Sequence, residues 1–205
     1  MYNSNIFMKN NGIINQNSIN NDNNLNTNQR TAQNSSSNKN HKSNKRTESL
    51  KIIHWNANSI NNKIQEFRHS IIEAQKPDII ALNETKLSTF RANHILCFDE
   101  YNVINKSRHE NKNGAGGVAL LIKKNLKFIQ IEVNTIDNEE IIGINLFIDQ
   151  VTITLFSYYN PPHCNLNINF LTEASKKYQN LLVIGDLNAK STSLNCKSTN
   201  SNGIL

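Results

Sequence analysis

The sequence predicts an α/β (α+β) fold: a four-layer α/β/β/α sandwich of two mixed β-sheets, with helices on both outer faces. Short apolar runs typical of β-strands recur from Leu50 onward. Two amphipathic helical segments lie between such runs, and the middle of the chain holds strand pairs with no helix between them. This order differs from the regular alternation of a doubly wound sheet, so it favours two packed sheets.

The first 48 residues differ in composition from the rest of the chain. Residues 1–48 contain 16 Asn, and their sparse apolar residues follow no period. Such a segment buries too little apolar surface to offset the entropy of ordering it. We therefore expect a disordered, Asn-rich basic tail at 1–48 and a partial folded domain at 49–205. The tail carries six Lys/Arg and two acids, hence +4 of the net +6; it is either a loose polyanion-binding arm or a solvated linker.

The folded part begins with the order strand, helix, strand. Lys51–Trp55 is a β-type run, and Asp78–Leu82 is a second apolar run that follows Pro77. Between them, apolar residues at helical spacing form one stripe: Ile60, Ile64, Phe67, Ile71 and Ala74. The pattern predicts a βαβ unit with two parallel strands.

Further strands and one helix follow. A tight hairpin is predicted at Asp149-Gln150, and Leu166–Tyr178 has helical periodicity. Thr85–Glu100 is interpreted as a polar stretch. Phe90, Phe98 and Tyr101 are expected to anchor a loop to the core, with stacking on nucleic-acid bases as the alternative. Strands are predicted at Tyr101–Asn105, Val118–Ile122, Phe128–Val133, Ile141–Ile148, Val151–Tyr158 and Leu181–Ile184.

No apolar run is long enough for a secretion signal or a membrane span, so we expect no membrane partner. The three cysteines are far apart and lack zinc-type spacing, which favours a reducing compartment. The sequence thus predicts an intracellular protein. The basic run Lys42–Arg46 leaves a nuclear location open, and the oligomeric state is not specified.

Four of the predicted strands end in small polar clusters, and strand ends are where loops converge in α/β folds. Glu84 and Asp186 offer hard carboxylate oxygens of the kind that suit Mg²⁺ or Mn²⁺. Asn56 and Asn188 offer amide oxygens and protons, and Tyr159 offers a phenolic donor. Together these groups suit hydrolysis of a phosphate ester, because a held cation and neutral donors stabilise charge that builds on phosphate.

Four segments in this order resemble the motifs of the endonuclease/exonuclease/phosphatase superfamily, which includes apurinic-site endonucleases and deoxyribonuclease I. They are Ile53–Ser59, Leu82–Lys86, Tyr159–Pro161 and Ile184–Ala189. The likeness is greatest to endonuclease domains of non-LTR retrotransposons, as suggested by Asn83–Leu87, Gly116–Ala119 and Asn202–Leu205.

The resemblance implies a role for each of these residues. Asn56 and Glu84 would bind the catalytic Mg²⁺, with Mn²⁺ as an alternative. Tyr159 would contact the scissile phosphate. Asp186 would orient or activate the attacking water, and Asn188 would hold phosphate and water in place. The implied function is a metal-dependent DNA endonuclease of a retroelement, with the DNA phosphate backbone as its partner.

The sequence departs from the family pattern in two respects. Asn58 stands where many relatives have Asp, and the late Asp and Asp-His pair of the family are absent. We therefore expect a fragment, incomplete at the C-terminus, with low or no activity. Among the histidines, His54 is expected to point away from Asn56, and His163 is the best placed substitute. The alternatives are a phosphatase on the same fold and a non-catalytic nucleic-acid-binding remnant.

Overall fold

The computed structural model of the chain describes residues 5–9, 49–107, 116–134 and 139–204. Its strands are β1 Asn5–Lys9, β2 Ile52–Asn56, β3 Ile79–Asn83, β4 Tyr101–Lys106, β5 Val118–Lys123, β6 Lys127–Ile131, β7 Glu140–Ile148, β8 Val151–Tyr159 and β9 Leu181–Asp186. Its helical segments before β9 are η1 Asn61–Lys63, α1 Ile64–Phe67, η2 Arg68–Glu73, α2 Thr89–Ile95 and α3 Ile168–Lys177.

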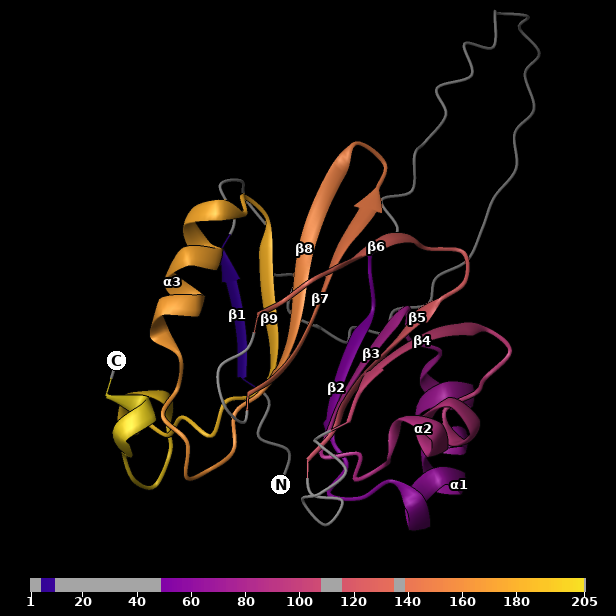
Figure 1. The fold of residues 1–205 in the computed structure, drawn as a ribbon, viewed down its shortest axis with the longest axis horizontal. Coiled ribbons are helices and arrows are strands. Elements are labelled where there is room, and N and C mark those ends of the chain that lie inside the picture. Colours follow the sequence, from indigo (N-terminus) through magenta and orange to yellow (C-terminus); the bar gives the residue numbers. More distant parts are fainter. Residues whose placement is uncertain (1–4, 10–48, 108–115, 135–138, 205) are drawn as a thin grey trace, which may run out of the picture. The chain divides into compact units, whose positions relative to one another are not determined.

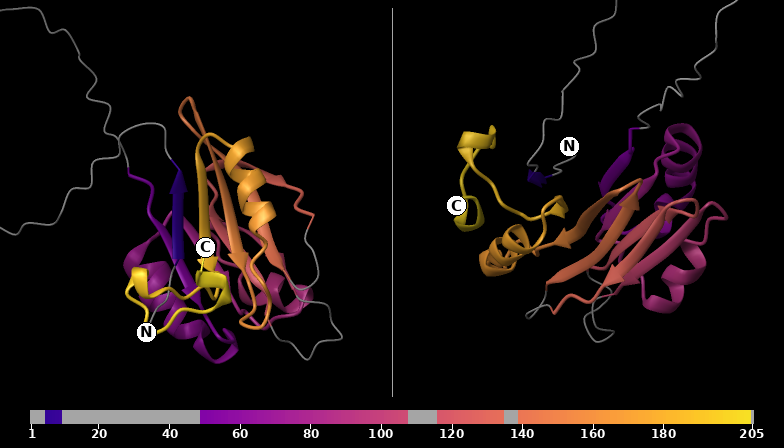
Figure 2. Two further views of the ribbon diagram at one scale, coloured as in Figure 1. Left: turned by 90° about the vertical axis from the view of Figure 1, so that its left-hand side faces the viewer. Right: turned by 90° about the horizontal axis from the view of Figure 1, so that it is seen from above.

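Two sheets pack against each other, with helices on their outer faces (Figure 1). One sheet has the order β2-β3-β5-β4, and the other has the order β1-β9-β8-β7-β6. Each sheet contains one parallel pair, β2/β3 or β8/β9, and its other neighbours are antiparallel. The views in Figure 2 show α1 and α2 outside the first sheet and α3 outside the second. The predicted four-layer sandwich of two mixed sheets is thereby confirmed.

Strand β1 lies within the segment for which the sequence predicts disorder. It pairs antiparallel with β9, from Asn5 opposite Gly185 to Lys9 opposite Leu181. These five residues pair with a buried strand, a contact that composition alone does not reveal. The rest of the predicted tail, including Lys42–Arg46, lies outside the described residues.

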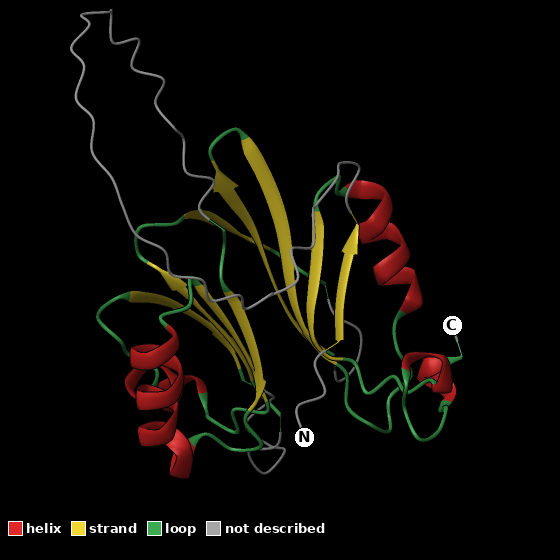
Figure 3. Cartoon of the chain, turned by 180° about the vertical axis from the view of Figure 1, so that it is seen from behind, coloured by secondary structure: helices red, strands yellow, loops and turns green. Residues whose placement is uncertain are grey.

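The predicted helix after β2 forms as three consecutive pieces, η1, α1 and η2 (red, lower left in Figure 3). The segment η2 is a π-helix, in which successive turns are joined by i→i+5 hydrogen bonds. This wider turn brings Ile72 onto the face of Phe67, while Ile71 is half-buried against the same apolar cluster. Ile72 is accordingly buried, whereas the regular helical spacing of the sequence places Ile71 there.

The helix α2 was not predicted, because the polar stretch around it masks a short apolar face. Its N-cap is Ser88, whose side chain accepts a hydrogen bond from Arg91 N–H at 3.3 Å. The helix α3 was predicted, and the side chain of Asn167 caps it by accepting from Phe170 N–H at 2.9 Å. The polar segment that follows β9 contains two short 3-10 turns, η3 Thr192–Leu194 and η4 Ser201–Gly203.

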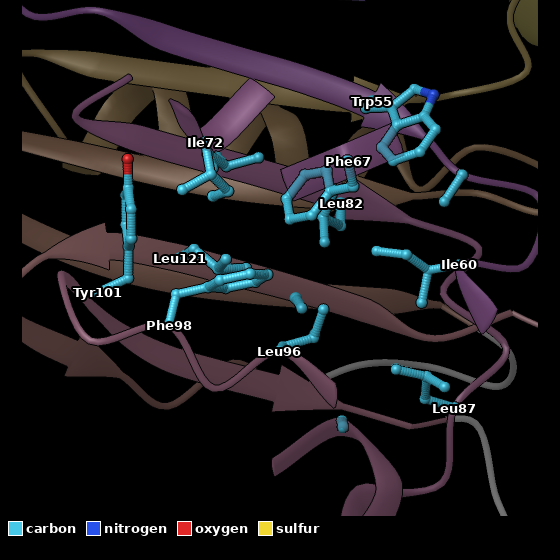
Figure 4. Packing of buried hydrophobic residues seen from close by; sticks show 14 residues of the cluster. Trp55, Ile60, Phe67, Ile72, Leu82, Leu87, Leu96, Phe98, Tyr101 and Leu121 are labelled. Carbon is cyan, nitrogen blue, oxygen red and sulfur yellow. The ribbon is translucent and has the colours of Figure 1, made fainter. Parts of the chain in front are cut away.

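Three apolar clusters fill the spaces between the layers. The cluster beneath α1 and α2 includes the stacked rings of Trp55 and Phe67, with Phe98 and Tyr101 close by (Figure 4). Phe98 and Tyr101 thus anchor their loop to the core as expected, but Phe90 is 73% exposed. A second cluster lies between the sheets, and a third lies between α3 and the second sheet.

Candidate active site

Strand alternation brings polar side chains together between the two sheets. On β2, β3 and β9 the residues that face the inter-sheet core alternate along the strand, and they include Ile52, Ile79, Ala81, Leu182 and Ile184. Continuing that period places three polar residues on the same face at the strand ends: Asn56, Asn83 and Asp186. The registers put Asn56 opposite Asn83 and Tyr159 opposite Asp186. The predicted convergence of the strand ends is therefore present.

Asn83 joins the two sheets and was missed as a site residue. It is fully buried, and its Oδ1 accepts a hydrogen bond from the backbone N–H of Asp186 at 2.8 Å. The same oxygen lies 2.7 Å from His54 Nε2. Because an amide oxygen can only accept, the proton in this contact is on His54. A buried polar residue at the end of an apolar strand was the available signal.

His54 does not point away from the site, so that expectation was wrong. It is two residues from Asn56, and residues two apart in a strand share a face. Burial lowers the pKa of His54, while its hydrogen bond to Asn83 and the charge of Asp186 act in the opposite direction. The net lowering favours the neutral imidazole, which here is an internal hydrogen-bond donor.

Two carboxylates from opposite sheets meet at the amide of Asn56. Its Nδ2 donates to Glu84 Oε1 and to Asp186 Oδ2, each at 2.9 Å. Its Oδ1 accepts from the backbone N–H of Asn58 at 3.1 Å, which fixes the orientation of the amide. Three of the predicted residues thus lie in direct contact, although Asn56 and Asp186 are 130 residues apart.

Glu84 lies just beyond β3 in a loop with a left-handed backbone, φ 51°. The loop is held by Thr85 N–H, which donates to Gly117 O at 3.0 Å. Gly117 has φ 90°, and a Cβ there would lie 2.5 Å from Thr85 Oγ1, so only Gly fits. The buried carboxylate of Glu140, on the opposite sheet, accepts from Gly117 N–H at 2.5 Å. Glu140 therefore positions the loop that carries Glu84.

Asp186 is placed by β9 itself. A Cβ on the preceding Gly185 would lie 1.9 Å from the backbone oxygen of Tyr158, so the strands approach this closely only with Gly. Asp186 Oδ1 accepts from the N–H of Asn188 at 3.0 Å. Tyr159 lies beside Asp186 in register and is 5% exposed, with its ring against the inter-sheet core.

Asn188 follows in a tight turn, φ 47°. Its Nδ2 donates to Asn160 O at 2.9 Å, and its own backbone oxygen accepts from Asn200 Nδ2 at 2.7 Å. Asn160 and Asn200 were not predicted, because they are ordinary loop residues until the fold places them. His163, the predicted substitute histidine, is exposed and makes no hydrogen bond to these residues in the described structure.

The donor set fits a divalent cation. Among the described residues no group of three His, Cys, Asp or Glu side chains could hold a metal ion. Two carboxylates and an amide oxygen nevertheless suit Mg²⁺, which keeps several waters and binds proteins through one or two carboxylates. Glu84 would hold the ion through its carboxylate, with the Asp186 carboxylate adjacent. Asn56 directs its Nδ2 toward both carboxylates and its Oδ1 toward Asn58 N–H, so its amide would have to turn over to place Oδ1 on the ion.

None of the described helices is both long enough and apolar enough to cross a bilayer.

Comparison with known proteins places this geometry in a family. The Endonuclease/Exonuclease/phosphatase family matches residues 53–205. A search of curated proteins finds no match. Among solved structures, the endonuclease domain of TRAS1, a telomere-specific non-LTR retrotransposon, is 21% identical, with a TM-score of 0.56 over 75% of this chain and 67% of that domain.

Two further solved structures share the fold. The human Nocturnin catalytic domain is 18% identical with a TM-score of 0.52, over 69% of this chain and 64% of that one. TDP2 from D. rerio, complexed with a single-strand DNA product, is 17% identical with a TM-score of 0.53, over 71% and 63%. The chain therefore spans about two thirds or less of each of these structures.

A two-sheet sandwich with carboxylates and amides gathered at one edge defines the class: the fold of phosphodiester hydrolases, both nucleases and phosphatases. Within that class, the chain belongs to the endonuclease/exonuclease/phosphatase family, whose pattern covers most of its length.

Proposed function

We propose that the protein is a Mg²⁺-dependent DNA endonuclease of a retroelement, with Mn²⁺ as an alternative ion. One observation carries the proposal: Asn56 Nδ2 joins Glu84 and Asp186 across the two sheets. This arrangement gathers a cation-binding carboxylate and a second carboxylate at the end of the sandwich where Tyr159 and Asn188 also lie.

The residues divide the chemistry between them. A divalent ion held by Glu84 and Asn56 would supply Lewis-acid stabilisation of the phosphate under attack. Asp186 would orient the attacking water and accept its proton, since its carboxylate is held by the N–H of Asn188. The Asn188 amide and the Tyr159 hydroxyl would donate to phosphoryl oxygens.

Two further considerations support nucleic acid as the substrate. The likeness to the TRAS1 domain accompanies retrotransposon-type motifs at Asn83–Leu87 and Gly116–Ala119. The D. rerio neighbour is a complex with a DNA product. A phosphatase is the second candidate, because a Bacteroides thetaiotaomicron mannosyl-6-phosphatase shares the fold at a TM-score of 0.52 and 13% identity.

We propose that turnover is slow. In the described structure the site residues include no histidine hydrogen-bonded to an aspartate. The Nε2 proton of His54 is donated in a hydrogen bond to Asn83. The leaving oxygen would then depend on water or the cation for its proton, and a positioned general acid or base contributes roughly 10²–10⁴-fold to a rate.

Nicking of supercoiled plasmid in Mg²⁺ tests the proposal. Wild type should convert supercoiled plasmid to the open circle, and Glu84→Gln and Asp186→Asn should each abolish this activity. Glu73→Gln is the matched control, because Glu73 lies on η2 and contacts His69 instead of the site.

Other outcomes separate the alternatives. Phosphate release from inositol phosphates without nicking would replace the endonuclease by a phosphatase. Absence of both activities in a folded protein would leave the non-catalytic binding remnant. Nicking that persists unchanged in Glu84→Gln and Asp186→Asn would show that the activity does not arise from this site.

A further inference from the structure

Two lysines beside the candidate active site donate to the same short loop, residues 57–58. Lys86 Nζ donates to Asn58 Oδ1 at 2.6 Å. Lys63 Nζ donates to the backbone oxygens of Ala57 and Asn58. All three acceptors are uncharged, and within the described part of the chain neither lysine forms an ion pair. Among the described carboxylates, none lies within ion-pairing distance of the two ammonium groups.

Backbone hydrogen bonds fix the loop after β2 against the loop after β3. Ala57 N–H donates to Asn83 O at 2.9 Å, and Ser59 N–H donates to Glu84 O at 2.8 Å. Lys86 lies in the second loop with a left-handed φ of 53°. The backbone that carries Glu84 thus also determines where Lys86 starts, so the lysine and the carboxylate keep a fixed relation.

Asn58 connects the lysines to the metal-binding candidates. Its backbone N–H donates to Asn56 Oδ1 at 3.1 Å, and Nδ2 of that amide donates to both site carboxylates. Its side chain meanwhile accepts from Lys86. A phosphate held by the ammonium groups would therefore lie beside the phosphate that the site carboxylates and cation act on.

We propose that Lys63 and Lys86 form an anion-binding subsite for a nucleic-acid phosphate next to the scissile one, which rests on the function proposed above. Each ammonium has three donors. Lys86 uses one on Asn58, and Lys63 uses two on backbone oxygens, so both keep donors for phosphate oxygens. The subsite depends on the neutral side chain of Asn58, because the negative charge of an Asp at this position would attract both lysines and compete with the phosphate.

The subsite can be tested by DNA binding without catalysis. Fluorescence anisotropy with a labelled DNA duplex in EDTA, over a series of salt concentrations, reports affinity and its salt dependence. Lys86→Gln should weaken binding about fivefold and reduce the salt slope by about 1. Asn58→Asp should weaken binding at least as much while keeping both lysines. The matched control is Lys124→Gln, which removes the same charge from an exposed position at the far end of β5.

The outcomes decide between the subsite and general charge. Equal losses in Lys86→Gln and Lys124→Gln, an unchanged affinity in Asn58→Asp, or no binding by wild type would overturn the proposal. Selective loss in Lys86→Gln and Asn58→Asp supports it even if no plasmid is nicked, in which case only the proposed function fails. Circular dichroism melting of each variant confirms that the compared proteins are folded.

Discussion

The two halves of the candidate site are held in place in different ways. In the four-stranded sheet, Glu84 lies past the end of its strand, in a loop supported by Gly117 and by Glu140 of the other sheet. In the five-stranded sheet, Asp186 belongs to its strand and is fixed by register against Tyr159.

The difference indicates how the site would respond to a ligand. The backbone of a paired strand cannot move without breaking hydrogen bonds, so the backbone of Asp186 is the fixed reference of the site. Glu84 lies outside the strand pairing, in a loop, so its backbone can adjust when a cation enters without breaking the sheet. Asn83 sets the relation between the halves, because it bonds directly to the N–H of Asp186.

The largest effect should come from Gly185→Ala, which changes the residue that precedes Asp186 in β9. The added Cβ would meet the backbone oxygen of Tyr158 at 1.9 Å, and backbone cannot rotate aside. We expect a loss of about 4 kcal/mol in the free energy of unfolding, from overpacking and backbone strain together.

Gly117→Ala is the counterpart in the loop half, where the Cβ meets a side-chain oxygen, Thr85 Oγ1, at 2.5 Å. Urea unfolding of both variants makes the comparison. A larger loss in Gly117→Ala than in Gly185→Ala would show that the loop half is the more rigid of the two.

Asn83→Leu should separate the halves at nearly constant side-chain volume. The substitution leaves the N–H of Asp186 and the imidazole of His54 without their acceptor. A buried donor without an acceptor costs about 1–3 kcal/mol, so for these two donors we expect a loss of about 3 kcal/mol in the free energy of unfolding. Asn62→Leu, at an exposed position, is the control. A loss equal to that of the control would mean that Asn83 does not hold the sheets together.

Cation binding should stabilise the folded protein through both halves at once. With Mn²⁺ at a hundred times its dissociation constant, the unfolding free energy should rise by about 2.7 kcal/mol, and EDTA should reverse the gain. Thermal melts of wild type, Glu84→Gln and Asp186→Asn measure this. We expect Glu84→Gln to lose more of the gain than Asp186→Asn. Equal stabilisation of all three proteins would place the cation elsewhere.

The smallest effect concerns pH. Burial lowers the pKa of His54 from 6.5 in the folded protein, so as pH falls the unfolded chain takes up a proton before the folded chain does. Stability from this residue is complete above about pH 6.5 and declines as pH falls below that value. His54→Gln keeps a nitrogen donor for Asn83 and should flatten the decline in urea unfolding between pH 7 and 5. The control His69→Gln, at an exposed position, should leave the decline unchanged. Parallel curves of unfolding free energy against pH in wild type and both variants would show that His54 does not cause the decline.

The layered fold and the convergence of the strand ends were predictable, because both follow from short apolar runs, from the helical segments between them and from the polar residues at the ends of the strands. Asn56, Glu84 and Asp186 were found in this way, and they are in contact. The turn at Asp149 is also local: Ile148 pairs with Val151 and Asp149 has φ 51°, as a two-residue hairpin requires.

What could not be predicted depends on contacts between distant segments. The roles of Asn83 and Glu140 appear only when the sheets face each other, since each bonds to a backbone N–H in the opposite sheet. Strand β1 is five residues long and lies in an Asn-rich segment, and its pairing with β9 becomes visible only in the fold. The shift from Ile71 to Ile72 follows from a π-turn, for which the sequence carries no simple signal.

The hydrogen bond from Asp186 N–H to Asn83 Oδ1 spans 103 residues of chain, and it has a consequence for folding. Contacts of such separation form late, because the entropy of closing the long loop must be met first. During synthesis the first sheet can assemble while Asp186 is still within the ribosome, and its buried polar end then stays hydrated. The site therefore comes into existence in the last docking step, and a partly folded chain would carry the motifs without the chemistry.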